Sequence, residues 1–259
     1  YGVIALEWDP SPTASVVAHR LSRRGTDGLW KNVSNNDLEK TITSFEDKTA
    51  EGGQFYEYML EAVNQNTAVS SPVYSPRVFM PGFLNQSVTL TASDSPIVLF
   101  SDLIVNPGVY LQVNPGVEFR VAGSDTFRLG KDTDRVEILV YGRIQMMGEA
   151  SAPIRFAPYN GASDRDHWAG FRLVNGEAGY SELGFIEMAG CKNQAIAIDG
   201  VGAYLHDLSI TNSEGGMAIN AVSSLPSVTN CRFTDIASTA VFVKDCRHFE
   251  LLNSTIEKA

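Results

Sequence analysis

The sequence lacks a long hydrophobic segment, an excess of basic residues and a visible leader. No apolar run approaches the 18 or more residues of a membrane-spanning helix, so we expect no membrane span in this fragment. With 20 Lys and Arg against 30 Asp and Glu, the net charge of −10 argues against nucleic acid as a partner. The start YGVIALEWDP has neither the basic region nor the apolar core of a signal peptide. Earlier removal of a signal and excision from a longer protein are both compatible with this start.

Cysteine is scarce, and its arrangement excludes two classes of small stabilised fold. The three cysteines are Cys191, Cys231 and Cys246, and none forms a C-x-x-C pair. The usual zinc-site spacing is therefore absent, and the odd count rules out a complete disulfide framework. The chain must build its core from apolar side chains instead, and Cys231 is expected to be one of the buried residues that fill it.

Residues 1–80 contain short segments in which apolar and polar residues alternate. Turn clusters such as Asp9-Pro10-Ser11-Pro12 and the stretch 24–28 separate these segments. Period-two alternation between turns predicts a small antiparallel sandwich. The residues expected on the apolar faces are Ile4, Leu6, Trp8, Val17, His19, Leu21, Tyr56, Tyr58, Leu60 and Ala62.

This segment resembles a fibronectin type III domain. The match consists of an early strand ending in Trp8, Trp30 in a middle strand, Gly53 before the alternating run that starts at Tyr56, and SSPVYSPRV at 70–78 as the last strand. The resemblance implies a corner hydrogen bond from Tyr56 and a role as spacer or adhesion module. The family's first strand is cut short here, because Trp8 comes too early. Met80-Pro81-Gly82 is the expected boundary, with a stiff junction.

Residues 82–259 contain a repeat of 22–23 residues. Leu205, Val228 and Leu251 are 23 residues apart, and Leu183 precedes the first of them by 22. Ile210, Phe233 and Ile256 show the same interval. Short apolar pairs of period two inside each unit predict strands joined by tight bends, with one coil per unit. Stacked coils would bring equivalent residues to the spacing of parallel strands, about 4.8 Å.

A polar column accompanies the apolar ones at Asp207, Asn230 and Asn253, again 23 residues apart. The inward alternation is broken at this point, which predicts a bend with left-handed backbone, a conformation that Asn and Asp tolerate best after glycine. The three side chains are also expected to form a structural ladder along the coils. The alternative is that these are ordinary loop residues, and the strict 23-residue spacing favours the ladder over it.

The repeat resembles the right-handed parallel β-helix of pectate-lyase-like proteins over residues 82–259. The matching stretches, in order, are SDLIVNPGVYLQVNPGVEFRV, ILVYGRIQMMGEASAPIRFAPY, HWAGFRLVNG and the 22–23-residue units. The expected fold class is therefore all-β, with an antiparallel sandwich followed by a right-handed parallel β-helix. Because no capping element precedes Ala259, we expect the β-helix to be truncated at its C-terminal end.

The pentapeptide VNPGV occurs at 105–109 and again at 113–117. Proline presets φ and glycine supplies the positive φ that a type II turn needs, so each Asn-Pro-Gly is predicted to be a corner. The flat sides between corners would face inward with Val109, Leu111, Val113, Val117, Phe119 and Val121. The repeat therefore predicts architecture rather than a duplicated binding motif.

No recognisable catalytic set is present. The polygalacturonase-like motifs N-T-D, D-D, G-H-G and R-I-K are absent. A pectate-lyase-like calcium site would need carboxylates on neighbouring coils, for which Asp132, Asp134, Asp164 and Asp166 are candidates. Because Arg135 and Arg165 adjoin them, these carboxylates also fit self-neutralised solvated loops. Calcium is the one cofactor suggested.

An aromatic cluster is the candidate for ligand binding. Trp168 is a candidate platform for a sugar ring, with His167 beside it and Tyr159 on the same loop. In the resembled family, the aromatic residue at this place more often covers the core.

The expected function is that of a non-catalytic extracellular or cell-surface module of a larger bacterial protein. It would act in adhesion, in binding a glycan or a surface protein, or as a rigid stalk. A polysaccharide-degrading lyase or glycoside hydrolase, with its active coils partly outside this chain, is the first alternative. A fibre component of a phage or secretion apparatus is the second.

Overall fold

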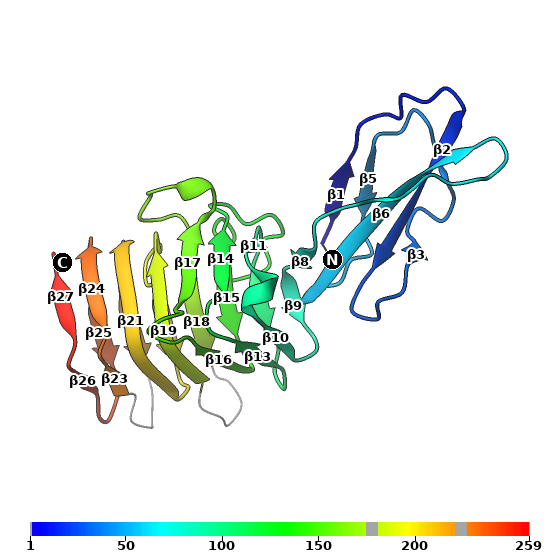
Figure 1. The fold of residues 1–259 in the computed structure, drawn as a ribbon. Helices are drawn as coiled ribbons and strands as arrows, with labels where there is room; N and C mark the ends of the chain where they lie inside the picture. The colour runs from blue at the N-terminus through cyan, green and yellow to red at the C-terminus, as the bar shows by residue number, and fades with distance from the viewer. Residues whose placement is uncertain (1, 175–180, 221–226, 259) are drawn as a thin grey trace. The chain divides into compact units, whose positions relative to one another are not determined.

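A computed structural model describes residues 2–174, 181–220 and 227–258. Its regular structure is almost entirely β, with two short 3-10 turns at Ala92–Asp94 and Tyr159–Gly161. Contacts divide the chain into two compact units, Tyr1–Met80 and Pro81–Ala259. Figure 1 shows both units, and each is described separately below. In the described part of the chain, no helix is long and apolar enough to cross a membrane.

The first unit is an antiparallel sandwich of two sheets. One sheet pairs two short strands, and the other has the order β3-β2-β6-β7, with β4 paired to β2 and β8 to β6. All of these pairings are antiparallel. The strands are β1 (Ile4–Glu7), β2 (Val16–Arg24), β3 (Lys31–Asn32), β4 (Leu38–Glu39), β5 (Ser44–Asp47), β6 (Gln54–Asn64), β7 (Val73–Tyr74) and β8 (Val78–Met80).

The face of β2 differs from the predicted alternation at its first residues. His19 and Leu21 are buried as expected, but Val17 is 41% exposed and Val16 is buried in its place. The pairing of β2 with β6 shifts register between Val16 and Ala18. A β-bulge adds one residue to one strand, so it turns the preceding side chains to the opposite face. The prediction that Val17 faces the core is therefore wrong.

A buried carboxylate organises the core of the first unit. Asp47 is 1% exposed and accepts hydrogen bonds from the phenol of Tyr58 (2.8 Å) and the guanidinium of Arg23 (2.5 Å). Its other oxygen accepts from the backbone N–H and the hydroxyl of Thr49 at 2.9 and 2.7 Å. Burial alone would raise the pKa of Asp47, but these donors outweigh it and the pKa is lowered.

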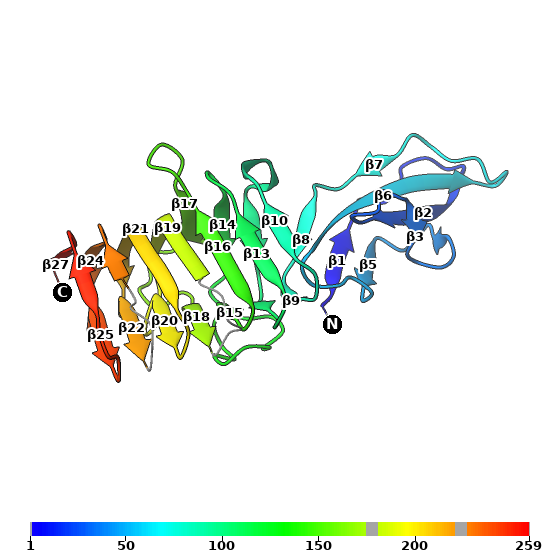
Figure 2. The ribbon, with the colours of Figure 1, turned by 90° about the horizontal axis from the view of Figure 1, so that it is seen from below.

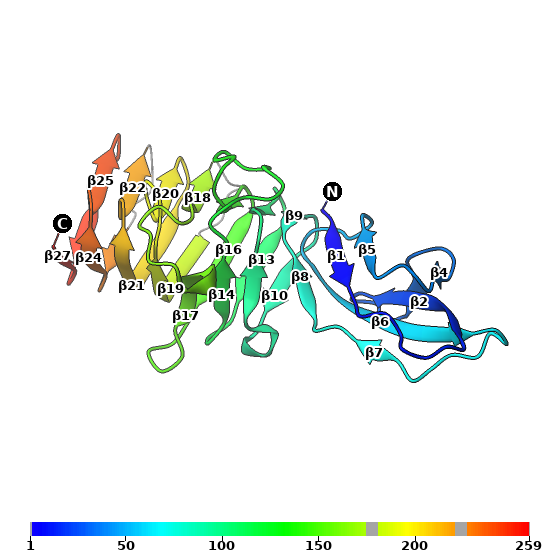
Figure 3. The same ribbon diagram turned by 90° about the horizontal axis from the view of Figure 1, so that it is seen from above.

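The second unit is a parallel β-helix with three strand positions per coil. The first position forms a seven-stranded parallel sheet, whose strands lie side by side in Figures 2 and 3. Its strands are β9 (Gly82–Leu84), β12 (Leu103–Val105), β15 (Glu137–Val140), β18 (Gly170–Val174), β20 (Ile196–Asp199), β22 (Met217–Asn220) and β25 (Val241–Lys244). We call this the β9–β25 sheet.

The second and third positions form one bent parallel sheet, because β19 and β21 run through both of them. Its strands are β10 (Val88–Leu90), β11 (Ile97–Leu99), β13 (Tyr110–Val113), β14 (Glu118–Val121), β16 (Arg143–Met147), β17 (Ile154–Pro158), β19 (Ser181–Ala189), β21 (Ala203–Ser213), β23 (Ser227–Thr229), β24 (Arg232–Ile236), β26 (Glu250–Leu252) and β27 (Thr255–Glu257).

The strand register confirms the 22–23-residue repeat. Leu183, Leu205, Val228 and Leu251 pair in succession across neighbouring strands. Met188, Ile210, Phe233 and Ile256 do the same at the next position. The continuous apolar columns inside the coil include stacked rings: Phe119 and Phe156 lie 4.5 Å apart between ring centroids and are nearly parallel. The repeat in the sequence is therefore the repeat of one coil.

The bend between the second and third positions has left-handed backbone in successive coils. Asp207, Asn230 and Asn253 have φ of 53°, 56° and 50°. Phe185, one coil before Asp207, has φ of 51°. Asp207 bonds the ring of His206 at 2.8 Å, whereas no hydrogen bond joins the three ladder side chains to one another among the described residues. The structure therefore shows a backbone column but no side-chain hydrogen-bond ladder.

The two Asn-Pro-Gly stretches are corners. Gly108 and Gly116 both have φ of 77°, and Val109 donates its N–H to the carbonyl of Asn106 at 3.1 Å, which closes the first turn. All six apolar side chains predicted to face inward beside these corners are buried. Positive φ at glycine is what a type II turn requires, so this prediction is confirmed.

Candidate functional site

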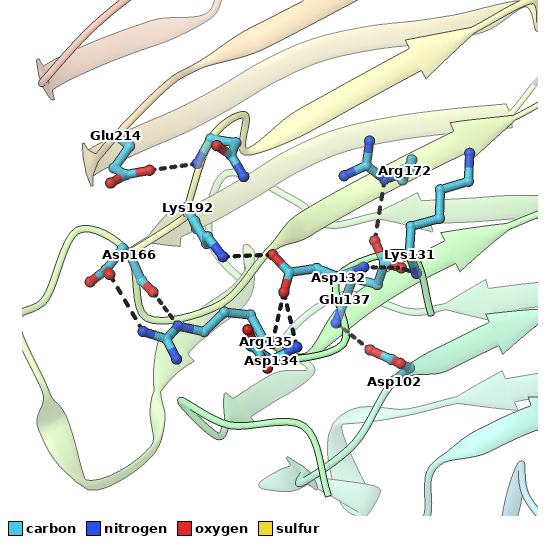
Figure 4. A network of polar contacts seen from close by, with 11 residues as sticks. Asp102, Lys131, Asp132, Asp134, Arg135, Glu137, Asp166, Arg172, Lys192 and Glu214 are labelled. Carbon is cyan, nitrogen blue, oxygen red and sulfur yellow. Dashed lines mark hydrogen bonds and ion pairs between the residues drawn. The ribbon is translucent and has the colours of Figure 1, made fainter. Parts of the chain in front are cut away.

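The connections from the third strand position back to the β9–β25 sheet vary in length, and the two longest carry most of the polar residues. Residues 122–136 connect β14 to β15, and residues 159–169 connect β17 to β18. The next connections are shorter, at 190–195 and 214–216. Figure 4 shows the polar contacts that join these loops at one corner of the β-helix. This corner is the candidate functional site.

Two buried acids lie at its base on neighbouring coils. Asp102 directly precedes β12 and Glu137 begins β15, so the pairing of these strands places them side by side. Both side chains are fully buried. The backbone N–H of Glu137 donates to Oδ1 of Asp102 at 2.7 Å. Arg172 of β18 donates from Nε to Oε2 of Glu137 at 3.2 Å, which partly balances its charge.

Gly130 passes between these two carboxylates. Its N–H donates to Oδ2 of Asp102 at 2.6 Å. A Cβ on this residue would lie 2.8 Å from the same oxygen and would also collide with Oε1 of Glu137. The next residue, Lys131, donates its backbone N–H to that Glu137 oxygen. A glycine is therefore needed here by close approach.

A third acid, Asp125, completes the buried group. It is 6% exposed and accepts hydrogen bonds from the hydroxyl of Ser101 and from the backbone N–H groups of Phe127 (3.1 Å) and Leu129 (3.2 Å). Burial, followed by a hydrogen bond with Asp125, raises the pKa of Asp102 to about 8. One of these two carboxyl groups therefore carries a proton at neutral pH.

The four acids proposed from sequence as calcium ligands are not assembled into a site. Asp132 pairs with Lys192 at 2.9 Å and accepts from the N–H groups of Asp134 and Arg135. Asp166 receives Arg135 at its carbonyl (2.7 Å) and its carboxylate (3.4 Å). Asp134 and Asp164 are exposed.

Across the described residues, no group of three or more His, Cys, Asp or Glu side chains is arranged to hold a metal ion. Asp132 and Asp166 form ion pairs, and Asp132 also accepts hydrogen bonds from the backbone of its own turn, whereas Asp134 and Asp164 are exposed. Among the described residues, Asp132, Asp134, Asp164 and Asp166 are therefore not brought together as one group of ligands.

Trp168 lies in the core, where the resembled family more often has this aromatic residue, and is not open to a sugar ring. Its ring is 0% exposed, stacks on Phe156 with centroids 5.6 Å apart, and donates from Nε1 to the carbonyl of Ala189 at 2.9 Å. His167 lies with Nε2 3.0 Å from the carbonyl of Val121. Tyr159 is 43% exposed. Trp168 therefore belongs to the core, and these three residues do not form an aromatic binding surface.

Sequence reasoning missed Asp102, Asp125, Gly130 and Glu137. The available signal was a pair of acids directly preceding or opening apolar strands, SDLIV and EILV. The two acids are 35 residues apart, because the insertion of 122–136 breaks the 22–23-residue spacing. The repeat therefore could not reveal that they are neighbours.

The arrangement can anchor a loop, but its acids are poorly placed for catalysis on a dissolved substrate. Asp102 and Glu137 are closed off from solvent, and their oxygens are occupied by backbone N–H groups and Arg172. A general acid must come within hydrogen-bond reach of its substrate. The site as described has no such access.

Comparisons with known proteins give no family for this chain. No protein-family model matches it, and no curated protein does. Among solved structures, pectate lyase Pel3 from Pectobacterium carotovorum aligns with 13% identity and a TM-score of 0.24, covering 98% of this chain and 88% of that chain. Pectate lyase PelI from Erwinia chrysanthemi aligns with 13% identity and a TM-score of 0.23, covering 99% and 88%.

PelI in complex with tetragalacturonic acid aligns with 12% identity and a TM-score of 0.24, covering 98% of this chain and 87% of that chain. These values support no inference about activity. The parallel β-helix is established by the strand register of this chain itself.

Proposed function

We propose that this chain is a non-catalytic extracellular or cell-surface module of a larger bacterial protein. Its parallel β-helix would serve as a rigid stalk or as a surface that presents binding loops. The observation that carries the proposal is the internal use of the corner's acids. Asp102 and Glu137 bind the backbone of the loop 122–136, and Asp125 binds Ser101 from within that loop. Asp132 and Asp166 are paired with cations. A polysaccharide-cleaving site of the pectate-lyase-like kind would need such groups open to substrate.

The first unit supports a modular surface protein. Its antiparallel sandwich is of the kind expected for a fibronectin type III domain. The hydroxyl of Tyr56 accepts a hydrogen bond from the backbone N–H of Glu51 at 2.9 Å, five residues upstream. A tyrosine near the start of a long strand that bonds back to the preceding corner recurs in sandwich domains. This bond and the strand pattern support the proposal that the first unit is a fibronectin type III domain.

A direct assay separates this proposal from the polysaccharide-degrading alternative. The purified chain is incubated with polygalacturonate and with tetragalacturonate, with and without calcium. Formation of unsaturated ends is followed by ultraviolet absorbance, and new reducing ends are followed chemically. We expect neither product. If either product forms, and a variant of the loop acids no longer forms it, the chain is a polysaccharide-degrading enzyme and the proposal is overturned.

Calcium dependence is tested separately by thermal unfolding. We expect no shift in Tm beyond that of a matched magnesium control, because Asp132 and Asp166 are already paired and the four candidate acids are not assembled into one group. A calcium-specific shift that disappears in the double variant Asp164→Ala, Asp166→Ala would favour the lyase-like function.

Glycan binding is tested on an array. Specific retention of one glycan class would define the module as an adhesin, whereas absence of binding would favour the rigid stalk. Assembly into long trimeric particles, measured by light scattering, would instead support the fibre alternative.

A further inference from the structure

We propose that residues 122–136 form a latch over the outer face of the β9–β25 sheet, held closed by a proton shared between Asp102 and Asp125. We call this segment the latch. The proposal concerns a conformational device in the β-helix and holds whether or not the chain binds a glycan.

The latch covers apolar side chains that would otherwise face water. Ile104 and Leu139 point out of the β-helix, because their neighbours along each strand point inward, yet they are only 1% and 2% exposed. With Val174 they form a cluster against which Leu129 of the latch and Tyr141 pack. Opening the latch would expose this cluster. Closure therefore has a hydrophobic contribution.

The latch is fixed by backbone N–H groups that point at buried carboxylates. Gly130 donates to Asp102, and Phe127 donates to the hydroxyl oxygen of Ser101 at 3.2 Å. Lys131 donates to Glu137. Asp125 is itself a residue of the latch, so the bonds that it accepts from Phe127 and Leu129 order the latch internally. Asp102 and Glu137 attach the latch backbone to the β-helix.

The charge around the pair explains why a proton is needed. Asp102 and Asp125 are both buried and share a hydrogen bond, and two adjacent buried carboxylates cannot both ionise without a large cost. The cation that contacts the group from a neighbouring strand is Arg172 of β18, and it binds Glu137.

The remaining charged groups around the latch are engaged elsewhere or exposed. Lys192, from the turn 190–195, pairs with Asp132, and Arg135 pairs with Asp166. Arg128, the Lys131 side chain and Asp134 are exposed. Among the described residues, no ion pair therefore neutralises Asp102 or Asp125.

The direction of the pH dependence follows from linkage. Burial and the hydrogen bond with Asp125 raise the pKa of Asp102 to about 8 from its ordinary value of 3.8. An open, hydrated latch would return that group to its ordinary value. The closed form is therefore favoured most below about pH 4, and loses that advantage as pH rises towards 8, by up to about tenfold per pH unit for one proton.

Hydrogen exchange measured by mass spectrometry tests this on the wild-type chain. After correction for intrinsic exchange rates, we expect the protection of peptides in 122–136 to fall at least tenfold between pH 6 and pH 8, and to level off above pH 8. Peptides of β16 (Arg143–Met147) serve as an internal control and should show no such change, because β16 lies in the other sheet of the β-helix. Equal protection of the latch at both pH values would overturn the proposal.

A variant pair identifies the responsible group. Asp125→Asn replaces the acid with a neutral amide that can donate to Asp102, at the loss of the bond from the Leu129 N–H. We expect weaker protection at every pH but no remaining pH slope. The matched control Asp134→Asn, on an exposed acid of the same loop, should keep the wild-type slope. A wild-type slope in Asp125→Asn would rule out the shared proton.

A measurement on the unaltered chain remains decisive if Asp125→Asn fails to fold. Carboxyl carbon-13 shifts of labelled aspartates should show a buried group that loses its proton near pH 8. If every aspartate titrates below pH 6, the latch is not held by a proton.

Discussion

Phe185 and Asp207 occupy the same bend in successive coils, and both have left-handed backbone, with φ of 51° and 53°. An aspartate tolerates this conformation through local hydrogen bonding, whereas a phenylalanine gains nothing comparable. The next two coils have asparagine at this position. The fold thus imposes left-handed backbone at this bend in each of these coils, and only some of the residues there favour that conformation.

Phe185→Asn is expected to raise the free energy of unfolding by about 0.5–1 kcal/mol, because asparagine fits the left-handed backbone better. The gain is limited by loss of the edge contact between Phe185 and His206. Chemical denaturation measures the change. The reverse change, Asn230→Phe, should lower stability by about 1–2 kcal/mol. If both variants shift stability in the same direction, backbone conformation is not the cause.

Removal of the hydroxyl of Tyr58 should destabilise the first unit by about 1.5–3 kcal/mol, since it donates to a buried carboxylate. Tyr58→Phe is the variant, and Tyr74→Phe, on a residue that is 52% exposed, is the control. Differential scanning calorimetry should show a lower Tm only for the first.

The Asp47 carboxylate makes the stability of the first unit depend on pH in acid. The pKa of Asp47 is lowered in the folded chain, so its contribution to stability is present above the unfolded value of 3.8 and is lost as pH falls below that value. The difference between Tyr58→Phe and wild type should therefore shrink at pH 3. An unchanged difference at that pH would contradict this assignment of the bond.

His19 should make the first unit sensitive to mild acid. It is 2% exposed, and burial lowers its pKa from 6.5, although a hydrogen bond to the backbone of Ile42 opposes the shift. The unfolded chain then binds a proton more readily than the folded chain. The contribution of neutral His19 to the free energy of unfolding is therefore fully present above pH 6.5 and is lost as pH drops below it. Unfolding between pH 7.5 and pH 5 should show this loss in wild type and in the control His248→Gln, but less of it in His19→Gln.

Trp168→Ala should destabilise the β-helix by about 3–5 kcal/mol, because it leaves a cavity beside Phe156 and removes the bond to the carbonyl of Ala189. Trp168→Phe should cost less. On a glycan array, neither variant should selectively lose a ligand that the wild type retains at full stability. Selective loss from a fully folded Trp168→Phe protein would return this residue to the binding surface.

The architecture was readable from sequence where one physical constraint repeats. The columns through Leu205 and Ile210 follow from stacking, and the corners at Gly108 and Gly116 follow from the φ that the turn demands. Val17 was misassigned because a bulge changes the face without changing the composition.

The candidate site was not readable in the same way. Asp132 and Asp164 stood out as acids in polar loops, but Asp102 and Glu137 lie at strand ends and become neighbours only through the coil register. Their roles depend on the path of the inserted loop, and no local sequence signal fixes that path.

The coil register is unchanged by the connections that interrupt it. Leu103 pairs with Ile138, Ile138 with Phe171, and Phe171 with Ile196, although the intervening connections differ greatly in length. The connections that lead into the β9–β25 sheet can therefore be exchanged for other sequences without a change of register. A foreign peptide inserted in place of 159–163, which leaves the buried Trp168 intact, should be displayed at a fixed height along the β-helix, and several such peptides could be spaced one coil apart.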